Sequence, residues 1–196
     1  MITPDLIQAF KDNVSEFYDI SYESLHLLKE ITEVRELKAG IILENVGDIP
    51  NSIYVIIDGY CRSYFVNEKG KEFTKAIYKP LDIFTSFNAI IKQIPADCYY
   101  ATLTKCTVIV TNYNEYINLR EQHPDILKFH FSYLENLICQ NDVRHKELLS
   151  MNATERYLSL RKQIPNIDNL IPQYQIATYL SITPVQLSRI RNNLNH

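Results

Sequence analysis

The sequence predicts an α+β protein in which a central β-sandwich or β-roll lies between two helical sections. Apolar residues follow a helical period near both ends of the chain, but from about residue 33 to residue 112 they form short β-branched and aromatic runs. All four glycines fall in this central section, where tight turns need residues that tolerate positive φ: Gly40, Gly47, Gly59 and Gly70.

The N-terminal section is predicted to hold two helices. In TPDLIQAFKDNVSEF, Thr3 suits the N-cap and Pro4 suits the first helical position. The apolar residues of this segment recur at helical spacing: Leu6, Ile7, Phe10, Val14 and Phe17. We expect a second helix in YESLHLLKEI.

The central section contains a series of predicted strands. In NSIYVIIDGYCRSYFVNEKGKEFTKAIY, β-branched and aromatic runs alternate with polar breaks, and NEKGKE predicts a hairpin turn. Strands joined by such turns pair in antiparallel fashion. We interpret the tyrosines of these strands as core and cross-strand packing rather than as a binding surface.

A long helix is predicted in HPDILKFHFSYLENLICQNDVRHKELLS, with Pro124 at its start. Seven of its residues alternate spacings of four and three and form a heptad seam: Leu127, Phe131, Leu134, Ile138, Asn141, His145 and Leu148. We expect the seam to pair with the same helix of a second copy, which is its simplest partner. The alternative is that this face packs on the chain's own β-section. Within the seam, Asn141 and His145 could fix the register or face a ligand.

The composition is that of a globular protein, with 196 residues, 46% hydrophobic residues and 22% charged residues. No apolar run reaches the roughly 18–20 residues of a membrane span, and the amphipathic N-terminus does not resemble a signal peptide. We therefore expect a cytoplasmic protein with reduced thiols. Its cysteines show no metal-ligand spacing and none precedes residue 61, which argues against an N-terminal cysteine-ligated cluster: Cys61, Cys98, Cys106 and Cys139.

The charge is unevenly distributed along the chain, whose formal net charge is -3. Residues 151–196 carry five basic and two acidic side chains, a net charge of +3, whereas the other 150 residues carry 15 basic and 21 acidic side chains, a net charge of −6. A basic end on an acidic body is typical of polyanion binding, although the same division can arise by chance.

The C-terminal segment IPQYQIATYLSITPVQLSRIRNNL predicts two short helices separated by SIT. Thr183 can cap the second helix and Pro184 can occupy its first turn. Ala177 would allow the two helices to cross closely, because a larger side chain would hold them apart. The pattern is that of a helix-turn-helix, whose second helix enters the major groove of DNA.

The second helix of this motif would expose polar side chains suited to DNA. Arginine can pair with guanine in bidentate fashion, and asparagine and glutamine can pair with adenine. The candidate DNA-binding residues are Thr183, Val185, Gln186, Ser188, Arg189, Arg191 and Asn192. Since two-helix hairpins are common, a solvated amphipathic helix end without a partner is the alternative at this point.

Several segments resemble the Crp–Fnr family of bacterial transcription regulators. IATYLSITPVQLSRIRNNL is similar to the family's helix-turn-helix, and LKAGIILENVGDIPNSIYVIIDGYCRSYFVNEKGKEFTKAIYKPLDIF is similar to its cyclic-nucleotide-binding β-roll. HPDIL resembles the start of its dimerisation helix. The resemblance implies a jelly-roll-like sensor domain with N-terminal helices in residues 1–122, a dimerisation helix in residues 123–150 and a helix-turn-helix domain in residues 151–196.

The resemblance also implies a function. A homodimer of this type would regulate transcription by binding a near-palindromic double-stranded DNA site, with RNA polymerase as a further partner. Arg189 is the strongest candidate for reading guanine. Ser181 stands where relatives commonly carry glycine, so a left-handed backbone there would cost on the order of 1 kcal/mol.

The residues of the nucleotide pocket depart from the family pattern. Thr85 replaces the glycine, Ser86 replaces the glutamate that holds the ribose, and Asp97 replaces the arginine that pairs with the cyclic phosphate. At about 4 Å and an effective dielectric near 20, each such charge interaction is worth roughly 4 kcal/mol, so the acid repels a phosphate. We expect no cAMP binding and no cofactor; an effector, if one exists, would meet these candidates: Phe84, Thr85, Ser86, Asp97, Cys98, Asn141 and Asp142.

Two other functions are less well supported by the residues. A haem ligand would be His130 or His145, but neither has a convincing partner. We find no Ser-His-Asp order, metal-ligand cluster, Gly-rich phosphate loop or pocket carboxylate pair, and therefore do not expect an enzyme. The alternative that stays open is a small-molecule-sensing module whose helix-turn-helix is vestigial or binds protein.

Overall fold

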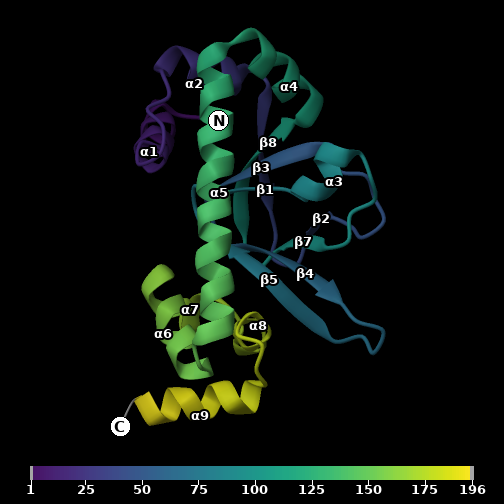
Figure 1. Ribbon diagram of the computed structural model, residues 1–196, viewed down its shortest axis with the longest axis vertical. Helices are drawn as coiled ribbons and strands as arrows, with labels where there is room; N and C mark the ends of the chain where they lie inside the picture. Colours follow the sequence, from purple (N-terminus) through teal and green to yellow (C-terminus); the bar gives the residue numbers. More distant parts are fainter. Residues whose placement is uncertain (1, 195–196) are drawn as a thin grey trace.

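The computed structural model describes residues 2–194 and has the predicted α+β architecture. Figure 1 shows helix α5 running along the molecule, with the strands on one side of it and the C-terminal helices at one end. Within the described residues, no helix is both long enough and apolar enough to cross a membrane.

The N-terminal helices begin at the predicted capping residues. Helix α1 spans Pro4–Val14, and the Thr3 hydroxyl accepts a hydrogen bond from the backbone N–H of Leu6. Helix α2 spans Tyr22–Glu30 and is capped by Ser21. Asp125 accepts hydrogen bonds from Tyr18 and Ser21, and these bonds fasten the segment between α1 and α2 to the start of α5.

Two four-stranded antiparallel sheets follow. One sheet, here called sheet A, has the strand order β1-β8-β3-β6, and the other, sheet B, has the order β2-β7-β4-β5. The strands are β1 Thr32–Leu37, β2 Ile42–Glu44, β3 Ser52–Asp58, β4 Cys61–Val66, β5 Glu72–Tyr78, β6 Ile83–Phe84, β7 Tyr99–Thr102 and β8 Cys106–Asn112. The strand section thus has almost the predicted limits.

The turns use glycine as predicted. Gly70 closes the hairpin between β4 and β5 with a φ of 75°, and its N–H donates to the carbonyl of Asn67. Gly59 has a φ of 89°, and a Cβ at this position would lie 2.3 Å from the carbonyl oxygen of Lys105. Any side chain at residue 59 would therefore push the turn between β3 and β4 away from the backbone just before β8.

The remaining helices connect and follow the sheets. Helix α3 spans Phe87–Lys92 within the strand section, and α4 spans Tyr113–Gln122 after it. The long helix begins at the predicted proline. The helices that follow α4 are α5 Pro124–Ser150, α6 Ala153–Gln163, α7 Ile167–Leu170, α8 Gln173–Tyr179 and α9 Pro184–Leu194.

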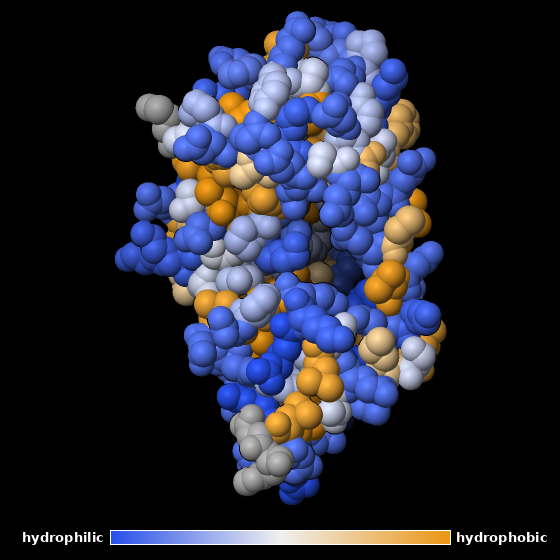
Figure 2. All heavy atoms as spheres, turned by 90° about the vertical axis from the view of Figure 1, so that its left-hand side faces the viewer, coloured by the Kyte–Doolittle hydropathy of each residue, from blue (hydrophilic) through white to orange (hydrophobic). Residues whose placement is uncertain are grey.

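Three apolar cores stabilise these parts. One lies within the strand section, a second joins α1 and α2 to α5 around Phe129, and a third lies among α6–α9 around Leu180 and Leu187. Figure 2, which faces α1 and α6, shows a mainly hydrophilic surface with separate hydrophobic patches at the level of the N-terminal helices and at the level of α6–α9. Each end of the molecule therefore has its own core and some exposed apolar surface.

Candidate nucleic-acid interface and sensor interior

Helices α8 and α9 form a helix-turn-helix arrangement. Thr183 begins α9 with a reciprocal cap, because its hydroxyl accepts from the N–H of Gln186 and the Gln186 side-chain oxygen accepts from the N–H of Thr183. Pro184 occupies the first position of the helix, where no N–H is needed. Local sequence thus determines where α9 starts.

The turn between α8 and α9 is held close to the core. Ala177 is completely buried, and its carbonyl accepts a hydrogen bond from Ile182 at 3.0 Å. Ser181 has a φ of 58°, so it is the left-handed residue of the turn. A small side chain at residue 177 and a left-handed residue at 181 are what this tight reversal requires.

Helix α9 buries one face and exposes the other. Leu187 is completely buried and Ile190 packs against the same core, whereas Leu194 near the end of the helix is 40% exposed. Six of the seven candidate DNA-binding residues are exposed: Thr183, Val185, Gln186, Ser188, Arg189 and Asn192.

The seventh candidate, Arg191, lies partly beneath this surface. Its Nε is 3.6 Å from Oδ1 of Asp168, and Oδ2 of the same carboxylate accepts a hydrogen bond from the Tyr157 hydroxyl. This ion pair links α9 to α7. Arg191 therefore has a contact within the protein, while Arg189 is exposed on the same helix.

A buried polar cluster joins the helix-turn-helix to the long helix. The carboxylate of Glu147, on α5, accepts hydrogen bonds from Ser159 at 2.5 Å and Gln163 at 3.3 Å, both on α6. Arg144 also contacts Glu147 and donates to the carbonyl of Tyr179 at 2.9 Å. The last turns of α5 thus determine where α6 and α8 lie.

Helix α8 also contacts the outer side of sheet B. The hydroxyls of Thr74 on β5 and Thr178 on α8 are 2.8 Å apart. Tyr60, Ile77 and Leu103 of the strand section pack against the core of the C-terminal helices. The strand section and the helix-turn-helix are therefore in direct contact within one chain.

A shallow hollow adjoins the exposed face of α9. It is lined by Asn152, Ala153 and Thr154 at the start of α6 and by Gln186, Arg189 and Ile190 of α9. Sequence reasoning did not select the three α6 residues as candidate site residues. The sequence does indicate that a helix starts here, because residues 152–155 read NATE. In this capping box, Asn152 and Glu155 satisfy each other's backbone N–H groups.

The heptad seam lies on a largely exposed side of α5. Phe131 is 58% exposed and Ile138 is 62% exposed, and Asn141, His145 and Leu148 are exposed as well. Leu127 and Leu134 are half-buried. The helix face that does pack within the chain carries Ile126 and Phe129, and it lies about a third of a turn away from the seam.

Aromatic rings fill the space between the two sheets. The Phe84 ring of sheet A lies 4.7 Å from that of Tyr78 and 5.9 Å from that of Tyr100, both of sheet B. The Tyr54 ring also stacks on that of Phe84, with the ring centres 5.3 Å apart. Burial raises the pKa of Tyr78 to about 12, so its hydroxyl is neutral and hydrogen-bonds with Ser63.

A carboxylate of the chain itself occupies the start of α3. Glu44 is buried, and its two oxygens accept hydrogen bonds from the Thr85 hydroxyl at 2.8 Å and the Ser86 N–H at 3.0 Å. Burial raises the pKa of the Glu44 carboxyl, while the two hydrogen bonds oppose this shift. The Thr85 hydroxyl and the Ser86 N–H are therefore already paired and are not free for a bound anion.

The structure brings only part of the candidate effector pocket together. Phe84, Thr85, Ser86 and Cys98 are buried in the strand section. Asp97, Asn141 and Asp142 are instead exposed, the last two on α5. Glu44 lies beside Thr85 and Ser86, although the sequence does not single it out.

Comparisons with known proteins agree with this architecture. Residues 34–123 match the family model described as "Cyclic nucleotide-binding domain". A Eubacterium rectale protein described as a Crp/Fnr-family transcriptional regulator is 12% identical, with a TM-score of 0.67, and the match covers 90% of this chain and 84% of that one. No curated protein matches the sequence.

Two further solved structures have the same fold. FixK2 of Bradyrhizobium japonicum is 16% identical with a TM-score of 0.69, covering 84% of this chain and 85% of that one. The catabolite activator protein of Thermus thermophilus is 18% identical with a TM-score of 0.57, covering 91% and 85%.

Residues 34–123, which hold almost the whole strand section, are thus similar to the cyclic nucleotide-binding domain family. The fold of the chain is the one found in Crp/Fnr-type regulators, and the predicted resemblance is confirmed at that level.

Proposed function

We propose that this protein is a sequence-specific DNA-binding transcription regulator that acts as a homodimer and does not bind cAMP. The observation that carries the proposal is the exposed polar face of α9 on a firmly anchored helix-turn-helix. The three segments 1–122, 123–150 and 151–196 would serve as sensor domain, dimerisation helix and DNA-binding domain. DNA as the partner is consistent with a cytoplasmic protein.

The chemistry of α9 supports DNA as the partner. Arg189 offers a bidentate donor pair for guanine, and Ser188 and Asn192 lie on the same exposed side of the helix. The Gln186 side-chain oxygen already accepts the hydrogen bond that caps α9, so the amide N–H₂ of this residue is the part left for a base or phosphate. The start of α6 would meet the DNA backbone beside Arg189, because Asn152 and Thr154 line the adjoining hollow.

Exposed apolar residues on α5 support a homodimer. Phe131, Ile138 and Leu148 recur at heptad spacing and face solvent in the single chain. Pairing two copies along this seam would bury them. Two recognition helices could then enter successive major grooves, roughly 34 Å apart.

Two features of the strand section support the absence of cAMP binding. Rings of Tyr54, Phe84, Tyr78 and Tyr100 fill the space between the sheets. In addition, the Glu44 carboxyl already accepts hydrogen bonds from the Thr85 hydroxyl and the Ser86 N–H, so neither donor is free for the phosphate of cAMP. Titration calorimetry should give no binding heat with cAMP, and saturable binding would contradict this part of the proposal.

The DNA-binding part can be tested by selecting sites from a pool of random duplexes. We expect the wild-type protein to enrich one near-palindromic sequence, and Arg189→Ala to weaken binding to it by about 1–3 kcal/mol in a gel shift. Lys128→Ala is a matched control, because it removes one positive charge from an exposed position on α5.

The result against the proposal would be that no sequence is enriched at low salt, or that the two variants weaken binding equally. Either outcome would favour the alternative function, a sensing module without a DNA site.

A further inference from the structure

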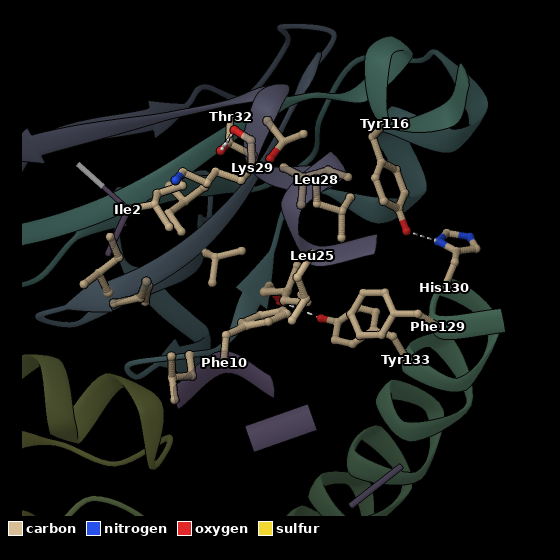
Figure 3. Close-up of a pocket in the computed structure, with 18 of the residues that line it drawn as sticks. Ile2, Phe10, Leu25, Leu28, Lys29, Thr32, Tyr116, Phe129, His130 and Tyr133 are labelled. Carbon is tan, nitrogen blue, oxygen red and sulfur yellow. Dashed lines mark hydrogen bonds between the residues drawn. The ribbon is translucent and has the colours of Figure 1, made fainter. Parts of the chain in front are cut away.

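A second interior space lies outside the β-roll. A partly open cavity of about 130 Å³ lies between α1 and α2, the outer face of sheet A, α4 and α5 (Figure 3). Its walls are almost entirely aliphatic and aromatic, and include Phe10, Leu25, Val55, Ile109, Phe129 and Tyr133.

This cavity is separate from the nucleotide pocket of the β-roll. Side chains alternate along a strand, so neighbouring residues of β3 face opposite sides of sheet A. Tyr54 points into the aromatic interior between the sheets, whereas Ile53 and Val55 line the cavity on the other side. None of the candidate effector-pocket residues lines it.

One end of the cavity carries a neutral polar group. The Tyr116 hydroxyl is 3.0 Å from Nδ1 of His130, and the guanidinium of Arg120 is 2.9 Å from Nε2 of the same ring. Since arginine only donates, Nε2 must accept, which puts the ring proton on Nδ1. Nδ1–H then donates to the Tyr116 oxygen, and the hydroxyl proton of Tyr116 remains available as a donor at the cavity wall (Figure 3).

The lining disfavours a charged occupant. Among the described residues that line the cavity, Lys29 is the one with a full charge, and His130 is neutral because burial and the adjacent Arg120 lower its pKa to about 4. An ion in such an apolar space would lose its hydration without compensation. By size, a dry apolar cavity of about 150 Å³ accommodates benzene.

We propose that this cavity binds a neutral, mainly apolar small molecule built on a single benzene ring, with one hydrogen-bond acceptor directed to Tyr116. The occupant would touch sheet A and α5 together, through Val55 and Phe129. Binding at this site does not depend on the proposed DNA-binding function.

The test measures binding of toluene and acetophenone to the full chain by calorimetry and by thermal shift. Both should bind the wild-type protein and raise its melting temperature, and acetophenone should lose at least threefold in affinity on Tyr116→Phe while toluene does not. Val55→Phe should weaken both at least tenfold, because the larger side chain fills the cavity. Val46→Phe is the matched control, since Val46 is exposed and does not line the cavity.

Failure of toluene to bind the wild-type protein, or equal binding by the wild-type and Val55→Phe proteins, would overturn the site. Tighter binding of benzoate than of toluene would overturn the neutral class of ligand. If Val55→Phe does not fold, Ile109→Ala serves instead: the enlarged cavity should bind indole at least threefold more tightly than the wild-type cavity does, and no gain would overturn the site.

Discussion

Ser181 adopts a left-handed backbone conformation that costs a residue with a side chain on the order of 1 kcal/mol. We expect Ser181→Gly to stabilise the protein by up to about 1 kcal/mol in urea unfolding. As a control, Ser188→Gly makes the same change inside α9 and should destabilise it by roughly 0.5 kcal/mol, since glycine has a lower helix propensity than serine. Destabilisation by Ser181→Gly would show that the strain at this turn has been misjudged.

His130 should make folding stability depend on pH. Burial, together with the charge of Arg120, lowers its pKa to about 4, whereas a histidine in the unfolded chain has a pKa of about 6.5. Between these values the unfolded state binds the proton and the folded state does not. The stabilisation is therefore complete above about pH 6.5 and is lost as the pH falls towards 4.

His130→Gln should flatten the pH dependence of the unfolding free energy between pH 6.5 and 4, since glutamine can still accept from Arg120 but does not titrate. His26→Gln removes an exposed histidine of α2 and should leave the wild-type profile in place. An unchanged profile for His130→Gln would contradict the buried neutral histidine.

At the scale of elements, the crossing of α8 and α9 depends on one small side chain. Ala177 is completely buried where the turn folds back on α8. Ala177→Leu should lower the unfolding free energy by about 1–3 kcal/mol through overpacking and weaken DNA binding together with it. Ala39→Leu, at an exposed position before β2, should change neither quantity, and a neutral Ala177→Leu would contradict the tight crossing.

Local signals predicted most of the elements. Alternation and turn residues placed the strand section at residues 33–112, and the strands run from Thr32 to Asn112. Caps and prolines predicted the starts of α1, α5 and α9. Helices α3, α4, α6 and α7 were not predicted. In α4, Tyr116 is the only buried residue, so the sequence of that helix has no clear apolar period.

The parts of the site that sequence did not predict depend on contacts between distant residues. Glu44 reaches Thr85 and Ser86 across 41 and 42 positions of the chain, and no local pattern indicates such a pair. The cavity beneath α1 is lined by residues from both helical sections and from sheet A, so its existence follows only from their packing. The exposed face of α9 was predictable, because a single helix determines it.

At the scale of the whole molecule, the exposed seam of α5 predicts dimerisation. Ile138→Glu places a charge within the seam and should give a monomer in analytical ultracentrifugation. Val143→Glu is a matched control, since Val143 is 60% exposed against 62% for Ile138 but lies on nearly the opposite side of the helix. Loss of the dimer in both variants, or in neither, would show that the seam is not the interface.

The central claim is that two copies of this chain read DNA with paired α9 helices. Hydroxyl-radical footprinting on the selected DNA site tests it most directly. We predict two protected regions related by twofold symmetry, with their centres about 10–10.5 base pairs apart, that disappear together in Ile138→Glu and in Arg189→Ala. A single asymmetric footprint, or symmetric protection that survives Arg189→Ala, would contradict the account.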